Sequence, residues 1–173
     1  KISDNSMNGS KIYLVSLDGP ITKNVDSTII KDNSYIFRKP ADAMKIWILR
    51  VPLKANISIE DLVVVAEPGT LSTELSGNSR GKGLPLNEKL QQWKDYKHSY
   101  DSIQWSFYQQ KNETTSQEIA DSLLAQSVNL NRQNKIKVIQ LINENLYNGI
   151  GLLLFKVYYN ELPPDFKRKI SEQ

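Results

Sequence analysis

Residues that could carry out catalysis are scarce in this chain of 173 residues. It has no cysteine and a single histidine, His98, so neither a thiolate site nor a zinc site built on histidines is expected. A serine, histidine and aspartate triad would have to use His98, and no serine lies in the G-x-S-x-G context of a nucleophile elbow. We expect His98 to be a solvent-exposed residue near the end of a helix.

The glycine-rich segment Gly77–Gly83 superficially resembles a phosphate-binding loop around Lys82. Its spacing does not fit, because three residues instead of four separate the glycines before Lys82, and Gly83 follows where a serine or threonine is needed. We interpret it as a flexible basic loop. The carboxylates of Glu60, Asp61 and Glu67 lie at strand ends and are expected to face solvent. No catalytic residue, metal ligand or cofactor site is therefore predicted.

The charge of the chain indicates local contacts rather than a dedicated nucleic-acid binder, because a net charge of +3 is small for that class. Basic residues form three local groups, at Arg38–Lys39, at Arg80 with Lys82, and at Lys167–Lys169. Each group could contact acidic lipid headgroups, and the alternative is ordinary solvated charge. The longest apolar run, Gly149–Phe155, is too short to cross a bilayer.

The elements that must position these residues follow from apolar periodicity and turn residues. Strands are expected at 11–17, 34–37, 44–51, 59–66, 103–108 and 152–159, of which 44–51 is central and pairs antiparallel with 59–66. Helices are expected from about 86 to 96 with a cap near Asn87, from a capping box at Thr115–Glu118, and from about 132 to a stop at Asn148–Gly149. The phasing of the large aromatic residues places them in the core; these are Trp47, Trp93, Tyr96, Tyr100 and Trp105.

Strands first, helices later and a closing strand predict an α+β fold, with a mainly antiparallel sheet and about three helices packed on one face. The length predicts a single domain over residues 1–173. Within it, composition predicts a flexible loop at about 69–85, which is a candidate contact surface, and a basic C-terminal tail at about 163–173.

The C-terminal tail carries a resemblance to a known family. Pro164-Asp165-Phe166-Lys167-Arg168, together with one small α+β domain, a flexible middle loop and no cysteine, resembles matrix proteins of negative-strand RNA viruses, rhabdoviruses in particular. Pro163-Pro164-Asp165-Phe166 also looks like the budding motif Pro-Pro-x-Tyr, with phenylalanine in place of tyrosine.

The resemblance implies a non-enzymatic structural protein that self-associates, contacts an anionic membrane surface and binds nucleoprotein, with no small-molecule substrate. It implies a location beneath the virion envelope and in the host cytoplasm. The contact residues expected on this interpretation are Arg80, Lys82, Lys167, Arg168 and Lys169. Many weak contacts between identical subunits and with lipid would then add up to strong assembly.

Two other functions remain open from the sequence. One is a bacterial surface or secretion-system accessory domain, tethered by a segment that precedes Lys1. The other is a small hydrolase or transferase whose site is assembled from distant parts of the chain. A concave pocket with convergent polar groups would favour the enzyme, and contacts between copies would favour the assembly protein.

Overall fold

The structure of the protein is a computed structural model that describes residues 1–17, 25–52 and 58–172. The chain divides into two compact units, which we call the sheet unit (Lys1–Gln91 with Tyr147–Ile150) and the helical unit (Gln92–Leu146 with Gly151–Gln173). The helices over Pro85–Glu113 and Gly149–Tyr158 each contain residues of both units. The single domain expected from the length stays a prediction.

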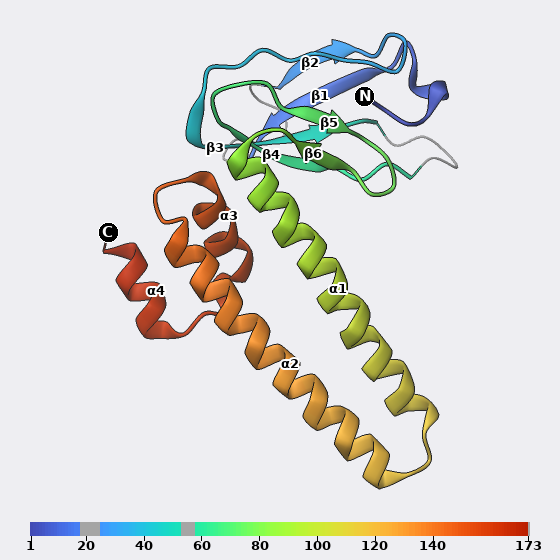
Figure 1. Cartoon of the computed structure of the whole chain (residues 1–173), viewed down its shortest axis with the longest axis vertical. Coiled ribbons are helices and arrows are strands. Elements are labelled where there is room, and N and C mark those ends of the chain that lie inside the picture. Colours follow the sequence, from blue (N-terminus) through green and yellow to red (C-terminus); the bar gives the residue numbers. More distant parts are fainter. Residues whose placement is uncertain (18–24, 53–57, 173) are drawn as a thin grey trace. The chain divides into compact units, whose positions relative to one another are not determined.

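Four strands form an antiparallel sheet in the order β2-β1-β3-β4 (Figure 1). Their bounds are Lys11–Ser16 for β1, Asp26–Ile29 for β2, Asp42–Arg50 for β3 and Leu62–Ala66 for β4. The predicted central position of β3 and its antiparallel pairing with β4 are confirmed. The α+β class is also confirmed, with four α-helices in the described part of the chain.

One face of this sheet carries the hydrophobic core of the sheet unit. The strand register places Leu14, Leu49 and Leu62 in one row across β1, β3 and β4. The next row holds Trp47 opposite Val64. Because side chains alternate between the faces of a strand, both rows point the same way. Five further residues from outside these strands are buried with them: Ile2, Met7, Ile30, Val51 and Leu75.

The strand predicted at 34–37 is wrong. Asp32 and Asn33 adopt left-handed φ values of 49° and 55°, and they form a tight turn in which Lys31 and Ser34 exchange backbone hydrogen bonds. After this turn, residues 35–40 follow no strand ladder. Tyr35 and Phe37 instead pack against the core through their rings. Apolar alternation here reflects anchoring by side chains and not pairing of the backbone.

The loop predicted at 69–85 is also wrong as secondary structure, because it contains an antiparallel hairpin of β5 (Ser72–Glu74) and β6 (Arg80–Lys82). Apolar and polar contacts hold the hairpin on the sheet unit. Leu75 is fully buried in the core, and the hydroxyl of Ser79 donates to the carbonyl of Glu60 at 2.6 Å. These contacts come from distant parts of the chain, so the glycine and serine content suggested only a loop.

Helix α1 (Pro85–Glu113) begins in the sheet unit, where β4 and the segment after it cap its first turn. Pro85 has no N–H to satisfy, and the carboxylate of Glu67 accepts the N–H groups of Leu86 at 3.1 Å and Asn87 at 2.9 Å. The prediction that Glu67 faces solvent is therefore wrong, because its carboxylate is bonded to the start of α1. Asn87 was predicted as the cap, but it lies within the first turn and its side chain bonds the backbone of Val65 on β4.

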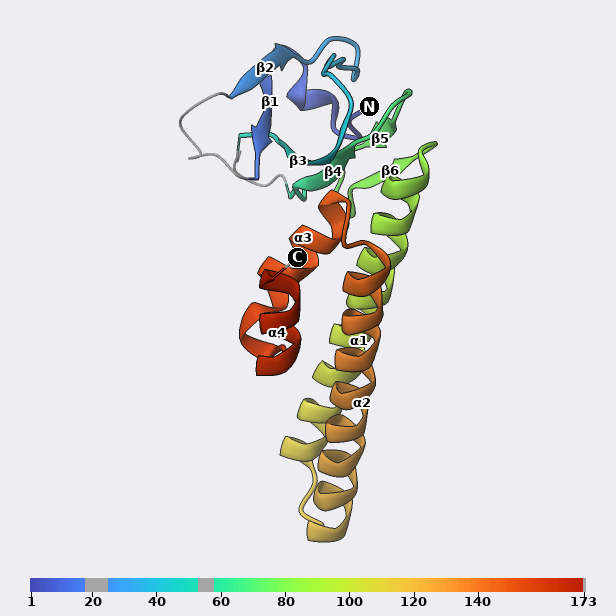
Figure 2. The ribbon, with the colours of Figure 1, turned by 90° about the vertical axis from the view of Figure 1, so that its left-hand side faces the viewer.

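In the helical unit, α1 and α2 (Gln117–Glu144) run side by side in opposite directions (Figures 1 and 2). The predicted helix start near Thr115 is confirmed within one residue, since the Ser116 hydroxyl is the N-cap and accepts the N–H of Ile119. The separate helix predicted from 132 is part of α2, which ends at Glu144. The predicted stop residue Asn148 instead accepts the N–H of Ile150, at the start of the next helix.

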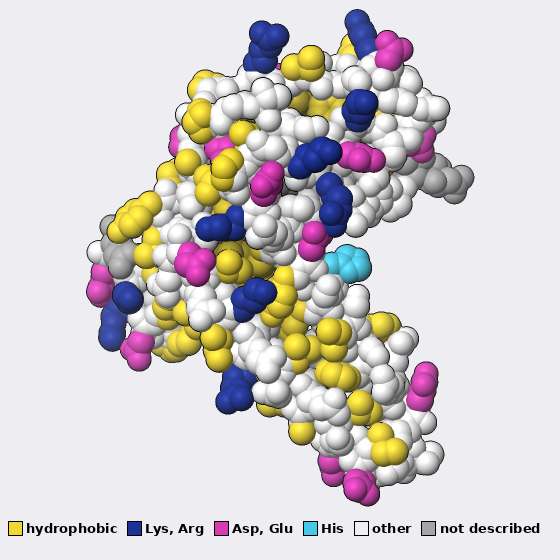
Figure 3. Space-filling model, viewed as in Figure 1, with side chains coloured by type: hydrophobic (Ala, Val, Ile, Leu, Met, Phe, Trp, Pro, Cys, Tyr) yellow, Lys and Arg dark blue, Asp and Glu magenta, His cyan; other side chains and the backbone are white. Residues whose placement is uncertain are grey.

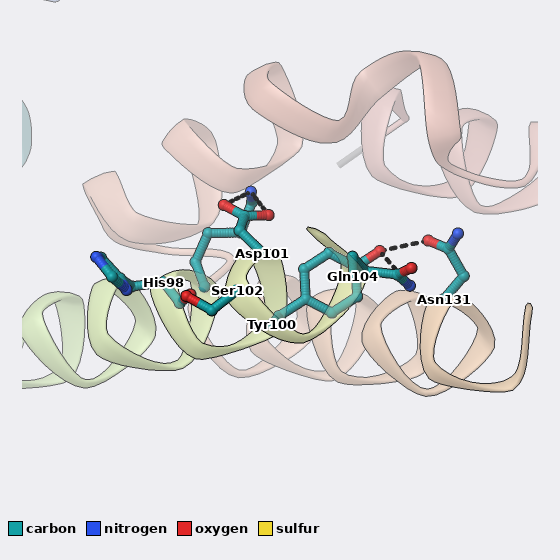
Figure 4. Close-up of polar contacts among 7 residues, drawn as sticks. His98, Tyr100, Asp101, Ser102, Gln104 and Asn131 are labelled. Carbon is teal, nitrogen blue, oxygen red and sulfur yellow. Dashed lines mark hydrogen bonds and ion pairs between the residues drawn. The ribbon is translucent and has the colours of Figure 1, made fainter. Parts of the chain in front are cut away.

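Polar side chains connect α1 and α2 (Figure 4). The hydroxyl of Tyr100 donates to the side chain of Asn131 at 2.5 Å. One turn later, Gln104 donates to the carbonyl of Ser127 at 3.1 Å and accepts from the Ser127 hydroxyl at 2.6 Å. These contacts use residues with low hydrophobicity, so apolar periodicity carries little signal for the pairing of the two helices.

Two predicted strands are helical in this unit. Residues 103–108 belong to α1, where Ile103 and Trp105 are 45% and 59% exposed instead of lining a buried face. Residues 152–158 belong to α3 (Gly149–Tyr158), whose buried residues Leu153, Leu154 and Tyr158 follow helical spacing. No proline or glycine occurs between Pro85 and Gly149, so nothing in the sequence interrupts the long helices.

The remaining elements are short. A 3-10 helix η1 covers Asn5–Met7, and η2 covers Tyr159–Glu161. The predicted basic tail is helical: α4 covers Pro164–Ser171, with Pro164 at its first helical position. Proline is favoured there because its missing N–H would have no helical partner.

Candidate binding cleft

A cleft of about 690 Å³ lies on the core-bearing face of the sheet, entirely within the sheet unit. Leu14, Trp47, Leu49 and Val64 from β1, β3 and β4 contribute its apolar lining. Residues 35–40 and 69–73 also line it, and both come from segments of the sheet unit whose secondary structure was predicted wrongly from the sequence. A volume of this order is typical of sites for small ligands.

Tyr35 connects these two lining segments. Its hydroxyl lies 2.7 Å from the hydroxyl of Thr73 on β5, and its ring lies 6.3 Å from that of Phe37. Burial raises the pKa of Tyr35 to about 12, and the hydrogen bond to Thr73 lowers this pKa by a smaller amount. The phenol is therefore protonated at neutral pH, and it acts as a structural link and not as a general base.

Trp47 is the residue of the cleft with an unsatisfied polar group. Its indole Nε1 is buried and has no hydrogen-bond partner among residues 1–17, 25–52 and 58–172. A buried donor without a partner costs about 1–3 kcal/mol, so such groups are uncommon in native proteins. The same ring has the ammonium of Lys39 at 5.1 Å from its centroid and that of Lys45 at 5.9 Å. Both distances are within the range of cation–π attraction.

The charges around the cleft favour an anion. Arg38 is exposed and makes no ion pair with the described residues. Lys39 pairs with Asp26 at 3.0 Å, and this hydrogen bond is the main cause that lowers the pKa of Asp26. The carboxylate of Glu67 also lines the cleft, but its charge is compensated by the N-terminus of α1. The lining thus presents a positive excess.

The five predicted contact residues lie elsewhere, in both units. Arg80 and Lys82 are exposed on β6, with Glu74 opposite Arg80 in the strand register. Lys167, Arg168 and Lys169 lie on α4. Lys167 lies over the ring of Tyr159 at 4.8 Å, and Arg168 pairs with Asp165 at 3.1 Å on an exposed surface. Within neither unit do all five come together as one site.

The prediction that His98 is exposed is confirmed, although it lies in the middle of α1 and not near its end. Figure 4 shows its ring pointing away from the contacts of Tyr100 and Asn131. Over residues 1–17, 25–52 and 58–172, no group of three or more His, Asp or Glu side chains is placed to hold a metal ion. Basic and acidic side chains are interspersed on the face seen in Figure 3, without one large basic patch.

Comparison with protein-family models, curated proteins and solved structures found no match to this chain. Of the helices in the described residues, none combines the length and the apolar character that crossing a membrane requires.

Sequence reasoning missed the cleft, although two of its features were visible. Arg38–Lys39 was identified as a basic group, and Trp47 was assigned to the core; it is half-buried and lines the cleft. The alternation of Tyr35 and Phe37 was interpreted as a strand. No spacing in the sequence connects these residues to Trp47 or Thr73, because the tertiary structure alone brings the segments together.

Proposed function

We propose that the chain is a non-enzymatic binding protein whose sheet unit receives, in the cleft beside Trp47, an anionic group attached to an apolar body. The observation that carries the proposal is the buried indole N–H of Trp47, which finds no partner in the described part of the chain and has two ammonium groups near its ring. An acceptor oxygen of a ligand would satisfy this donor, and its charge would be attracted by Lys39 and Lys45.

The other polar groups of the cleft support binding more than catalysis. The hydroxyl of Tyr35 is bonded to Thr73, and burial keeps it protonated. The carboxylate of Glu67 accepts three hydrogen bonds from Leu86 and Asn87, which leaves it poorly placed to act as a base. What the cleft offers a ligand is an apolar lining, a free donor and cations.

Decanoate is a suitable first probe, because it joins a carboxylate to an apolar chain. In a background with Trp93→Phe and Trp105→Phe, the emission of Trp47 should change saturably with decanoate, and much less with decan-1-ol. The double variant Arg38→Ala/Lys39→Ala should weaken decanoate binding by about tenfold, which corresponds to the loss of one good charge-assisted contact.

The matched control removes the same charge from an exposed part of α2, as Arg132→Ala/Lys135→Ala. It should leave the affinity for decanoate unchanged. No response of Trp47 to decanoate, or an equal response to decan-1-ol, would refute an anion-binding cleft.

A second candidate function is the matrix-like one, in which the protein self-associates and contacts an anionic membrane and nucleoprotein. Helix α4 favours it. Phe166 and Ile170, four residues apart, are partly buried on one side, while Arg168 and Lys169 are exposed. The exposed cations of α4 would be attracted to acidic lipid headgroups.

For this candidate, the protein should cosediment with vesicles that contain phosphatidylserine and not with phosphatidylcholine alone. The variant Lys167→Ala/Arg168→Ala/Lys169→Ala should lose binding by more than about tenfold, since each cation near an anionic surface contributes about 1 kcal/mol. Lys111→Ala/Arg132→Ala/Lys135→Ala removes the same number of exposed charges from α1 and α2 and is the control. Equal losses in both variants would show a general charge effect and exclude a role for α4.

A further inference from the structure

Residues 35–40 have the features of an extended segment. Side chains alternate along it: Tyr35 and Phe37 are partly buried, whereas Ile36 and Arg38 are exposed, Ile36 by 72%. Three side chains hold the segment in place. Tyr35 is bonded to Thr73, Phe37 packs against the core, and Lys39 pairs with Asp26. Alternation with a period of two is typical of an extended backbone.

The backbone of this segment is not paired. Among the described residues, no backbone hydrogen bond involves residues 35–40. The segment is thus fixed in place by its side chains, while its C=O groups and the N–H groups of residues 35–39 have no backbone partner in the described part of the chain. An extended backbone with unpaired groups is a template for a further strand.

The free edge of β4 differs from this segment. Val65 has its N–H and C=O bonded by the side chain of Asn87, at 3.0 and 2.9 Å. This amide takes the place of a neighbouring strand, so the edge of β4 is blocked at Val65. Of these two backbone stretches that line the cleft, residues 35–40 are the one open to an added strand.

We infer that the occupant of the cleft is an extended acidic peptide segment of a partner protein, which pairs with the backbone at residues 36–38. An apolar side chain of the peptide would enter the cleft beside Trp47, and its acidic side chains would lie near Arg38 and Lys45. The inference rests on the proposed function and specifies its ligand. Charge complementarity selects an acidic peptide, and the unpaired backbone selects an extended one.

The test uses the whole chain and a short capped peptide of alternating glutamate and leucine. The peptide should change the emission of Trp47 in the Trp93→Phe/Trp105→Phe background. A peptide with lysine in place of glutamate should not. N-methylation of the peptide backbone removes its donors and should weaken binding by about tenfold or more, because paired backbone groups supply much of the affinity of an added strand.

Amide hydrogen exchange distinguishes this inference from the proposed function. The acidic peptide should slow exchange at residues 36–38 at least about tenfold, whereas decanoate should not, and exchange at 114–116 in the connection of α1 to α2 is the internal control. If decanoate binds and the peptide does not, or the peptide binds without protecting residues 36–38, the inference is wrong and the proposed function stands. If neither probe affects Trp47, both are wrong.

Discussion

The variant Gly151→Ala is expected to destabilise the protein by about 3 kcal/mol or more, although it adds only one methyl group. A Cβ atom at residue 151 would lie 2.7 Å from the carbonyl carbon of Asn145, still closer to the Asn145 carbonyl oxygen, and 3.2 Å from the nitrogen of Leu146. These are backbone atoms at the end of α2, so no side-chain rotation relieves the contact. The connection between α2 and α3 would have to move.

The sign of this effect makes the measurement decisive. Alanine is favoured over glycine inside a helix by about 1 kcal/mol, so without the close contact Gly151→Ala would stabilise α3. Thermal unfolding followed by circular dichroism should instead show a midpoint lower by about 6–12 °C. Gly77→Ala is the control, because its Cβ would lie 3.6 Å from the nearest atom, an ordinary contact. A Gly151→Ala protein as stable as its parent would contradict the approach of α3 to Asn145.

Asn87→Ala is expected to cost about 2–6 kcal/mol of unfolding free energy, because two backbone groups of a buried residue lose their partners at about 1–3 kcal/mol each. Asn87 is 3% exposed, and its amide accepts from the N–H of Val65, donates to the carbonyl of Val65 and donates to Glu67. Alanine can replace none of these bonds. The loss should appear as a lower denaturant midpoint in urea unfolding.

Two further variants separate this bonding from a general effect of asparagine. Asn143→Ala removes an exposed asparagine from α2 and should be neutral or slightly stabilising, because alanine has the higher helix propensity. Asn87→Asp keeps an acceptor for the N–H of Val65, loses the donor to its carbonyl and places a second carboxylate beside Glu67. It should be at least as unstable as Asn87→Ala. Full stability of Asn87→Asp would mean that Asn87 does not hold β4.

Asn87 also links stability to the proposed function. It blocks the edge of β4, while Glu67 beside it fixes the start of α1 and lines the cleft. Removal of the Asn87 amide would therefore open a second backbone edge in the sheet unit. Exposed edges promote pairing with other chains, so we expect Asn87→Ala also to increase aggregation.

The sequence predicted well those elements whose signal is local. Strands β1, β3 and β4 were visible because β-branched and aromatic residues are concentrated there between turn residues. The start of α2 was visible because serine and threonine side chains cap a helix through neighbouring residues alone. In both cases, the interactions that form the element lie within a few residues.

The sequence failed where a local pattern fits two structures. Ile103, Trp105 and Phe107 alternate as in a strand, yet they lie in a helix without a breaker residue, and Trp105 stays exposed and stacks on Tyr108 at 5.3 Å. The apolar run after Gly151 is compatible with a buried strand or a buried helix, and periodicity over so few residues does not separate them. The packing partners decide, and the sequence does not name them.

By itself, the sequence determined the α+β class, the central strands and the scarcity of reactive groups, because these depend on composition and on contacts between near neighbours. Only the tertiary structure decided the cleft, since its lining comes from β1, β3, β4 and two segments without a clear local pattern. The roles of Glu67, Asn87 and Trp47 were decided in the same way. Each depends on a hydrogen bond, or on the lack of one, whose partner lies far away along the chain, and that pairing is fixed by how the units fold.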